Sequence, residues 1–167
     1  DFDKNIEITL EANPDDLNKN FLKNLAKTEI NRLSIGTQSF FEEDLKLMNR
    51  AHNASEAESS IKRAQDFGFE NLSIDLIYGS PTSNFEIWKQ NLQKTIELQV
   101  PHVSSYALTI EPKTALNAWI KKNKISKPEE STQNKEFYYL SDFLKDQGFT
   151  HYEISNFAKK DFESKHN

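Results

Sequence analysis

Four polar side chains stand at or near the ends of apolar segments of this 167-residue sequence, and side chains of these types could hold a polar ligand. They are Glu11, Gln38, Asp75 and Glu111. Carboxylates and an amide form hydrogen bonds with hydroxyl, amine and carboxylate groups. A set that is dispersed along the chain suits such a ligand better than it suits a nucleophile with its base. We therefore predict a binding site and no catalytic residue.

Three of these residues also have simpler explanations. Glu11 could favour the positive end of the following helix. Gln38 could be an ordinary polar turn residue, and Glu111 could cap a helix. Asp75 differs from them, because it stands inside an apolar segment where an ionised carboxylate is costly unless it is paired. We expect Asp75 to contact a partner or a ligand.

Arg50 is a further candidate, because arginine occurs at few positions of the sequence, namely Arg32, Arg50 and Arg63. By default Arg50 would be an exposed surface side chain. A guanidinium also forms two parallel hydrogen bonds with a carboxylate. Arg50 could therefore pair with a carboxylate of the ligand.

Cysteine and histidine limit the chemistry of the chain. The sequence has no cysteine, which excludes a disulfide framework, a thiolate zinc site, a cysteine nucleophile and a cysteine-ligated iron–sulfur cluster on these residues. The four histidines lie far apart, with no pair at the spacing of a zinc motif. We predict no metal site, and structural roles for His52, His102 and His151.

The candidate residues need a scaffold, and the pattern of apolar residues predicts one. Segments rich in β-branched residues indicate strands at residues 6–10, 32–36, 72–78 and 103–110, with helical patterns between them. Strands that alternate with helices form parallel βαβ units, which here fit part of an α/β barrel. Chemistry in such barrels lies at the carboxyl ends of the strands, near which the candidate residues fall.

The alternation changes after residue 112. Helices are predicted at residues 114–122 and 128–147, and a last strand at residues 151–154. The sequence therefore predicts an α/β fold with a partial parallel (β/α) barrel in residues 1–112. A C-terminal α+β extension occupies residues 113–167.

The composition excludes several classes of protein. Acidic residues outnumber basic ones by 26 to 21, which argues against a nucleic-acid partner. No apolar run approaches the roughly 20 residues of a transmembrane helix, and no signal-like leader is present. We expect a cytoplasmic protein without a transmembrane segment. Because the chain begins Asp1-Phe2-Asp3 without an initiator methionine, we also expect a fragment of a longer protein.

Several segments carry a resemblance that is more specific than any of these patterns. They are ITLEANP at residues 8–14, NRLSIGTQSF at 31–40, NRAH at 49–52 and LSIDLIYG at 72–79. In this order they resemble consecutive motifs of the oxygen-independent coproporphyrinogen III oxidase family of radical S-adenosylmethionine (SAM) proteins. YEISNFA at residues 152–158 and SKHN at 164–167 are similar to the haem-chaperone branch of that family. The resemblance implies about four of the six strands of a radical SAM barrel.

The resemblance assigns roles to the candidate residues. It implies that Glu11 binds the amino group of SAM, that Gln38 and Asp75 bind its ribose hydroxyls, and that Arg50 pairs with its carboxylate. His166 becomes a candidate for haem binding. Two positions depart from the family, because Lys113 and Asp161 stand where it usually has glycine.

The resemblance also implies what lies outside these residues. The family's cluster-binding cysteines precede the first strand described here, so a 4Fe-4S cluster and its electron donor are expected only in a longer parent, and this chain alone should be inactive. The expected ligand of the parent is a porphyrin or haem.

Three functions remain open at this point. A haem chaperone is the first. A true coproporphyrinogen III oxidase, which decarboxylates propionates, is the second. The third is an unrelated barrel enzyme that uses Glu11 and Glu111 as acid and base.

Overall fold

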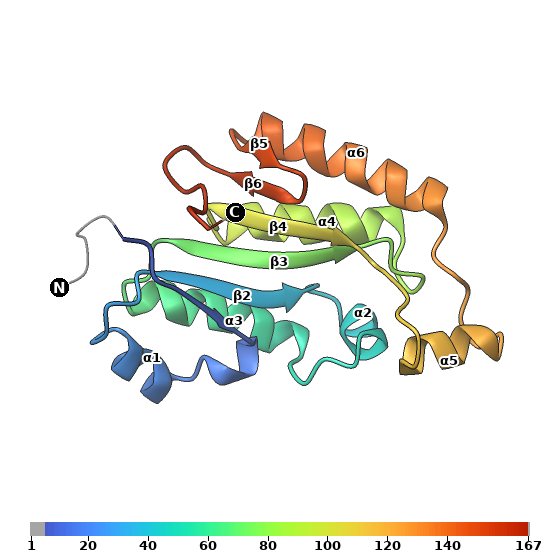
Figure 1. Ribbon diagram of the computed structural model, residues 1–167, viewed down its shortest axis with the longest axis horizontal. Coiled ribbons are helices and arrows are strands. Elements are labelled where there is room, and N and C mark those ends of the chain that lie inside the picture. The colour runs from blue at the N-terminus through green and yellow to red at the C-terminus, as the bar shows by residue number, and fades with distance from the viewer. Residues whose placement is uncertain (1–5, 167) are drawn as a thin grey trace.

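The computed structural model describes residues 6–166, which form one six-stranded open sheet with helices (Figure 1). The strands are β1 (Thr9–Ala12), β2 (Arg32–Gln38), β3 (Leu72–Tyr78), β4 (His102–Ala107), β5 (Thr150–Glu153) and β6 (Asn156–Ala158). The helices are α1 (Lys19–Leu25), α2 (Glu42–Leu47), α3 (Ala54–Asp66), α4 (Phe85–Glu97), α5 (Ala115–Lys121) and α6 (Glu130–Asp146), and a short 3-10 helix, η1 (Pro14–Asp16), follows β1. The strand order is β1-β2-β3-β4-β6-β5.

The first four strands are parallel, and the predicted α/β class is confirmed. The last two strands form a hairpin that adds to β4 in the antiparallel direction. The C-terminal region therefore shares one sheet with the four parallel strands. Among the described residues, no helix is long and apolar enough to cross a membrane.

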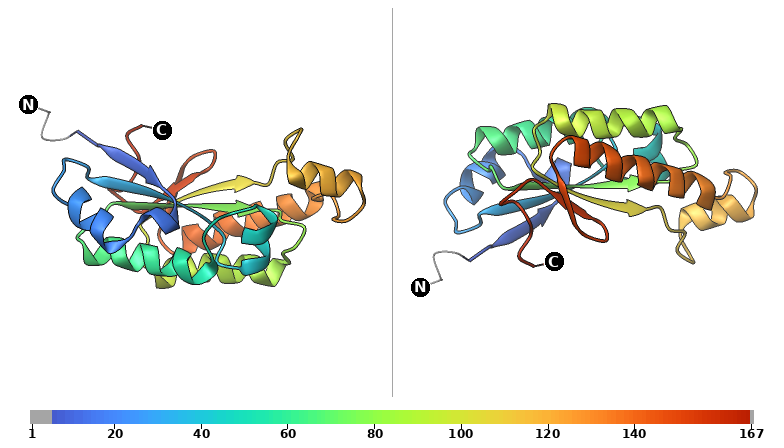
Figure 2. Two further views of the ribbon diagram at one scale, coloured as in Figure 1. Left: turned by 90° about the horizontal axis from the view of Figure 1, so that it is seen from below. Right: turned by 90° about the horizontal axis from the view of Figure 1, so that it is seen from above.

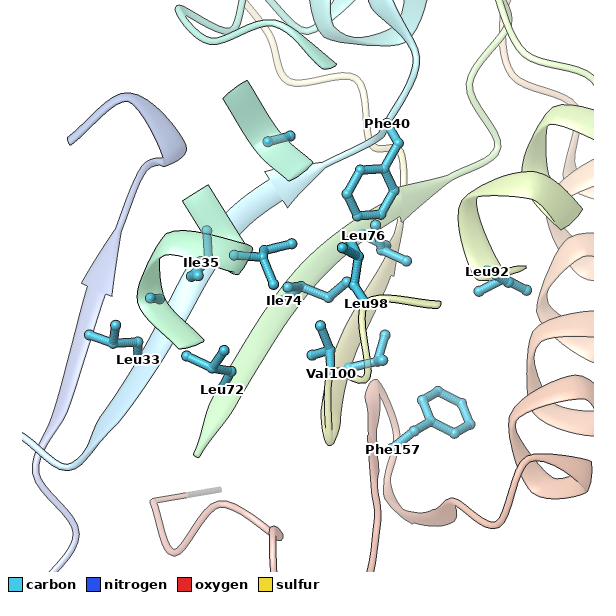
Figure 3. Packing of buried hydrophobic residues seen from close by; sticks show 14 of the residues in the cluster. Leu33, Ile35, Phe40, Leu72, Ile74, Leu76, Leu92, Leu98, Val100 and Phe157 are labelled. Carbon is cyan, nitrogen blue, oxygen red and sulfur yellow. The ribbon is translucent and has the colours of Figure 1, made fainter. Parts of the chain in front are cut away.

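One face of the sheet is covered by helices and carries the apolar core. The long helices α3, α4 and α6 lie on this face (Figure 2). Alternate residues of the central strands are fully buried beneath them; these include Leu33, Ile35, Leu72, Ile74 and Leu76 (Figure 3). Burial of a side chain of this size contributes about 1.5–3 kcal/mol. This packing fixes the central strands in the sheet.

The opposite face of the sheet is polar, and the long helices leave it open (Figure 2). The strand register aligns Glu11 with Ser34, Ser34 with Ser73, and Asp75 with Ser104. Side chains alternate between the two faces of a strand, so the residues between the core positions gather on this open face.

Several elements differ in detail from the sequence-based expectations. The first strand spans Thr9–Ala12 instead of residues 6–10, and the helix expected after Pro14 is divided into η1 and α1. Asn18 caps α1 by accepting a hydrogen bond from the Phe21 amide, and the large apolar side chain of Phe21 is 39% exposed. The division of the helix rotates Phe21 away from the core.

The hairpin was the main element missed from the sequence. Strand β6 has only three residues and lies two residues after β5, so it shows no alternating pattern of its own. All three of its residues are buried because it is inserted between β4 and β5.

Candidate functional site

The open face contains a cavity of about 870 Å³, which is in the range of roughly 300–1,000 Å³ that holds small ligands. Residues of the four parallel strands line it together with both ends of the described chain. The lining residues are Ile6, Glu7, Thr9, Glu11, Arg32, Ser34, Asp75, Ser104, Tyr106, Ser164, Lys165 and His166. Three predicted site residues, Glu11, Asp75 and His166, therefore share one cavity.

Asp75 is the lining residue with the most perturbed acid–base behaviour. Burial, and to a smaller extent the nearby carboxylate of Glu11, raise the pKa of Asp75 to about 6. The positive charges of Arg32 and Arg50 oppose this effect. Asp75 thus holds its proton more tightly than an exposed aspartate does. A ligand that donates hydrogen bonds or carries positive charge would favour the ionised carboxylate.

Gln38 and Arg50 meet at Gly36 near the carboxyl end of β2. Arg50 Nη2 donates hydrogen bonds to Asn13 Oδ1 at 2.7 Å and to the Gly36 carbonyl at 3.2 Å. Gln38 has a positive φ of 64°, at an irregularity in the register between β2 and β3. A Cβ on Gly36 would lie 3.1 Å from Arg50 Nη2 and 3.2 Å from Gln38 Nε2. Glycine therefore leaves the room that both side chains occupy.

The structure thus arranges the four predicted cofactor-binding residues as two pairs. Glu11 and Asp75 line the cavity, whereas Gln38 and Arg50 converge on Gly36. The charge of Arg50 lowers the pKa of Asp75, so the two pairs lie within electrostatic reach of each other.

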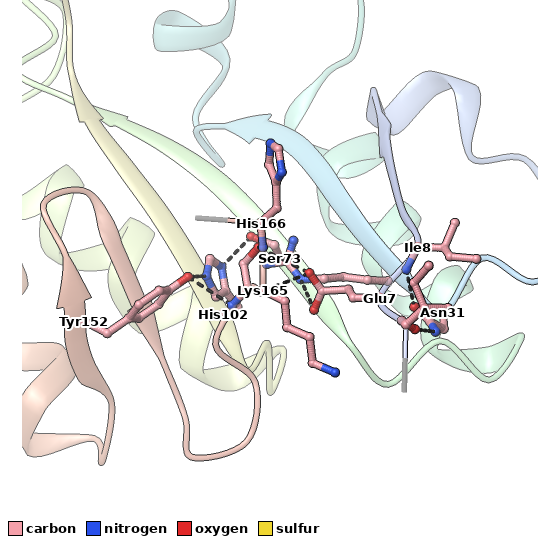
Figure 4. Close-up of polar contacts among 11 residues, drawn as sticks. Glu7, Ile8, Asn31, Ser73, His102, Tyr152, Lys165 and His166 are labelled. Atoms are coloured by element: carbon pink, nitrogen blue, oxygen red, sulfur yellow. Dashed lines mark hydrogen bonds and ion pairs between the residues drawn. The ribbon is translucent and has the colours of Figure 1, made fainter. Parts of the chain in front are cut away.

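His166 belongs to a short C-terminal strap, residues 164–166, that lines the cavity and contacts the start of the described chain (Figure 4). Glu7 Oε1 accepts hydrogen bonds from the Lys165 amide at 3.1 Å and from Ser164 Oγ at 3.4 Å. The Ser164 amide donates to the hydroxyl of Tyr152 at 3.1 Å. Contacts with Glu7 and with Tyr152 therefore help to hold the strap beside the cavity.

His102 connects this strap to the sheet. Its fully buried ring lies between Ser73 Oγ, 2.6 Å from Nδ1, and the Tyr152 hydroxyl, 2.8 Å from Nε2. Burial and the charge of Arg32 lower the pKa of His102 to about 3. The imidazole is therefore neutral near pH 7 and has a structural role.

The other predicted structural histidines are also engaged in packing. Buried His52 lies 3.1 Å from the Thr37 carbonyl through Nε2, and burial lowers the pKa of His52. His151 stacks on Phe157 with 4.1 Å between ring centroids. Among residues 6–166, no group of three or more histidine, aspartate or glutamate side chains could hold a metal ion.

Glu111 is exposed and does not line the cavity with Glu11. Its carbonyl accepts a hydrogen bond from Thr114 Oγ1 at 2.8 Å, and Thr114, not Glu111, caps α5. This arrangement gives no support to an acid–base pair made of Glu11 and Glu111.

Sequence reasoning did not identify several residues of the cavity, among them Glu7, Arg32, Ser34 and Ser104. Glu7 and Ser34 each stand between two apolar residues, Arg32 begins an alternating segment, and Ser104 precedes a second serine, Ser105. The same alternation that predicts the strands also marks one face of each strand as polar. It does not indicate whether water, helices or a ligand covers that face.

Comparisons with known proteins identify the family of the chain. A family model described as the radical SAM superfamily matches residues 2–95. A protein named heme chaperone HemW from Lactococcus lactis is 39% identical over 161 residues, which are 96% of this chain and 42% of the relative. The HemW of Escherichia coli is 35% identical over the same share of this chain, again 42% of the relative.

One solved structure extends the likeness to three dimensions. The coproporphyrinogen III oxidase HemN of Escherichia coli, described as a radical SAM enzyme, superposes with a TM-score of 0.81 and 28% sequence identity. The match covers 93% of this chain and 36% of that protein. The chain thus spans less than half the length of these relatives.

Proposed function

Because the chain belongs to the radical SAM superfamily, we propose that its open sheet face binds SAM and that it serves haem metabolism as a haem chaperone. The family implies SAM and a 4Fe-4S cluster as cofactors. The sequence has no cysteine to ligate such a cluster, so we assign no step through it to these residues. Within the proposal the cluster, and the electron donor that serves it, belong to a longer parent in the cytoplasm.

The residues fit SAM by charge and by hydrogen-bonding capacity. In the proposal, Glu11 binds the amino group, Gln38 and Asp75 accept from the ribose hydroxyls, and Arg50 pairs with the carboxylate. Because Gly36 has no Cβ, the ends of the Arg50 and Gln38 side chains can both lie against it. SAM supplies radical chemistry when a reduced cluster stands beside it, and the residues described here bind and orient it.

The assignment to haem is carried by one observation, the position of His166. This side chain lines the same cavity as Glu11 and Asp75 and is held there by the strap. A neutral imidazole is a common ligand of haem iron. The relatives named as haem chaperones support the same assignment.

A haemin titration of the purified protein tests this proposal. The wild type should give a saturable shift of the Soret band, and His166→Ala should weaken binding by about tenfold because the proposed iron ligand is lost. His151→Ala is the matched control, because His151 lies outside the cavity. Equal affinity of His166→Ala and wild type would contradict the role of His166, and an absence of binding would contradict the haem proposal.

The likeness to HemN supports a second candidate, an oxidase that decarboxylates the propionates of coproporphyrinogen III. The parent protein with a reconstituted cluster distinguishes the two. Consumption of coproporphyrinogen III with release of carbon dioxide would favour the oxidase, whereas stable haem binding without turnover would favour the chaperone.

A further inference from the structure

Arg32 stands out among the cavity residues because its buried guanidinium has unfilled hydrogen-bond donors. The residue is 4% exposed, begins β2 and lines the cavity. In the described part of the chain, neither Nε nor Nη2 of Arg32 has a hydrogen-bond partner. The nearest carboxylate oxygen is Oε2 of Glu7, 3.9 Å from Nε, which is too far for a hydrogen bond.

Glu7 does not supply the missing acceptors, because its Oε2 lies 3.9 Å from Arg32 Nε and its other carboxylate oxygen is directed to the strap. Its Oε1 accepts hydrogen bonds from the strap residues Ser164 and Lys165. Glu7 therefore balances part of the charge of Arg32 from a distance and leaves the planar donor edge of the guanidinium open.

The other two arginines show how this chain usually satisfies a guanidinium. Arg63 donates from Nε to the Leu17 carbonyl at 3.0 Å and from Nη1 to Ser59 Oγ at 3.3 Å. Arg50 donates to Asn13 and to the Gly36 carbonyl. Buried donors without acceptors are rare in folded proteins, so the open edge of Arg32 indicates that something else accepts from it.

We propose that Arg32 binds a carboxylate of the ligand in the cavity, and that this carboxylate is a propionate of the bound tetrapyrrole. A carboxylate matches the planar donor edge of a guanidinium with two parallel hydrogen bonds. The identity of the ligand rests on the proposed function, in which His166 binds haem in the same cavity. The carboxylate of SAM has its own partner in Arg50, so a second anion is needed to account for Arg32.

This arrangement assigns two recognition roles to one cavity. His166 would bind the iron, and Arg32 would select tetrapyrroles whose propionates are free. Asp75 and Glu11 lie along the same face and would repel a carboxylate, so Arg32 marks the part of the cavity where the propionate is favoured.

Esterification of the ligand tests the inference directly. The purified protein is titrated with haemin and with haemin dimethyl ester, in which both propionates are masked. Wild type should bind haemin about tenfold more tightly than the ester, and Arg32→Gln should bind both equally. Arg32→Lys, which keeps the charge and loses the planar fork, should retain only part of the preference. Lys23→Gln, an exposed change of the same charge on α1, should retain all of it.

The outcomes separate the two proposals. If wild type binds haemin and its ester equally, or if Arg32→Gln keeps the preference, the role of Arg32 is wrong while haem binding stands. If neither tetrapyrrole binds, the proposed function fails. A titration with acetate, monitored through the NMR signal of the Arg32 Nε–H, then tests whether Arg32 binds a carboxylate. A saturable shift of that signal would support a carboxylate site, and its absence would overturn the site.

Discussion

The buried carboxylate of Asp75 makes the stability of the folded protein depend on pH. Its pKa is about 6 in the folded protein and 3.8 for an unperturbed aspartate, so the folded state binds the proton more tightly between these values. Asp75 therefore contributes less to stability as the pH rises through this window. The cost above pH 6 is roughly 1–3 kcal/mol.

We predict that Asp75→Asn stabilises the protein at pH 7.5 by about 1–3 kcal/mol and has little effect near pH 4. Asparagine keeps the size and polarity of the side chain but does not ionise. Urea unfolding at a series of pH values measures the difference. A difference between variant and wild type that stays constant with pH would show that desolvation of the charge is not its origin.

Gly36 shows how the absence of a side chain shapes the site. A methyl group there would press on the flexible ends of Arg50 and Gln38, and Gly36 does not have a positive φ. Gly36→Ala should therefore change stability by less than about 1 kcal/mol and weaken SAM binding by about tenfold. Gly68→Ala is the control, and the two expected effects are reversed in it. Gly68 has a φ of 89° with no neighbour within 4 Å, so alanine there should cost stability and leave SAM affinity unchanged, as calorimetry can show.

At the scale of elements, α6 holds the turn that follows β3. Glu136 on this helix accepts a hydrogen bond from the Gly79 amide at 2.6 Å, and its carbonyl accepts one from the indole of Trp88 at 3.0 Å. Gln133, one helical turn earlier, donates to the Leu108 carbonyl at 3.0 Å. The helix thus fixes the segments that leave the carboxyl ends of β3 and β4.

Gly79→Ala should disrupt this contact between helix and turn. Gly79 has a φ of 77°, and a Cβ on it would collide with the side chain of Gln133. We expect a loss of about 2–3 kcal/mol in the free energy of unfolding, from backbone strain and overpacking together. Gly148→Ala, with a φ of 81° and no neighbour within 4 Å, measures the strain alone. Gln133→Ala removes the colliding atoms and also the hydrogen bond to Leu108, so it is the reference for the double variant. Relative to Gln133→Ala, the added Gly79→Ala should cost only the strain, and a loss as large as in the wild-type background would exclude the collision.

The elements that could be predicted from the sequence are those with long periodic patterns. Strand β3 spans the residues expected, and helices lie between the parallel strands as the helical patterns predicted. Strand β6 could not be predicted, because pairing with β4 determines it and three residues carry no period. Lys113 and Asp161, noted as departures from glycine, have positive φ values of 69° and 73°, so these turns keep a glycine-like conformation without glycine.

The candidate site could be predicted only in part, for a similar reason. Asp75 follows from strand alternation, because its face of the sheet is fixed by the core residues beside it. Glu11 was predicted only as a residue after the end of the first strand, which in the structure spans Thr9–Ala12. The convergence of Arg50 with Gln38 at Gly36 depends on a loop conformation and a register irregularity that no local pattern encodes. The unpaired donors of Arg32 could not be predicted either, because they depend on the three-dimensional positions of the acceptors around the guanidinium.

At the scale of the whole molecule, the strap joins the last described residues to the first strand region across 157 positions of sequence. Glu7 contacts the strap on one side, and on the other side the Tyr152 hydroxyl, which also lies 2.8 Å from His102 Nε2, accepts from the Ser164 amide. Local segments of a protein open without global unfolding when contacts that hold them are removed. Both contacts therefore contribute to the position of His166 in the cavity.

Tyr152→Phe removes one of these contacts and keeps the aromatic ring that packs against His102. The Ser164 amide then lacks its acceptor, and the loss of about 1–1.5 kcal/mol should speed its hydrogen exchange by about tenfold. Amides of the central strands should keep their protection. Tyr138→Phe, at a tyrosine that is 69% exposed on α6, should leave the exchange of Ser164 unchanged. Because the strap carries His166, haemin affinity should fall in Tyr152→Phe in parallel with the loss of protection, whereas unchanged protection at Ser164 would show that the Tyr152 hydroxyl does not hold the strap.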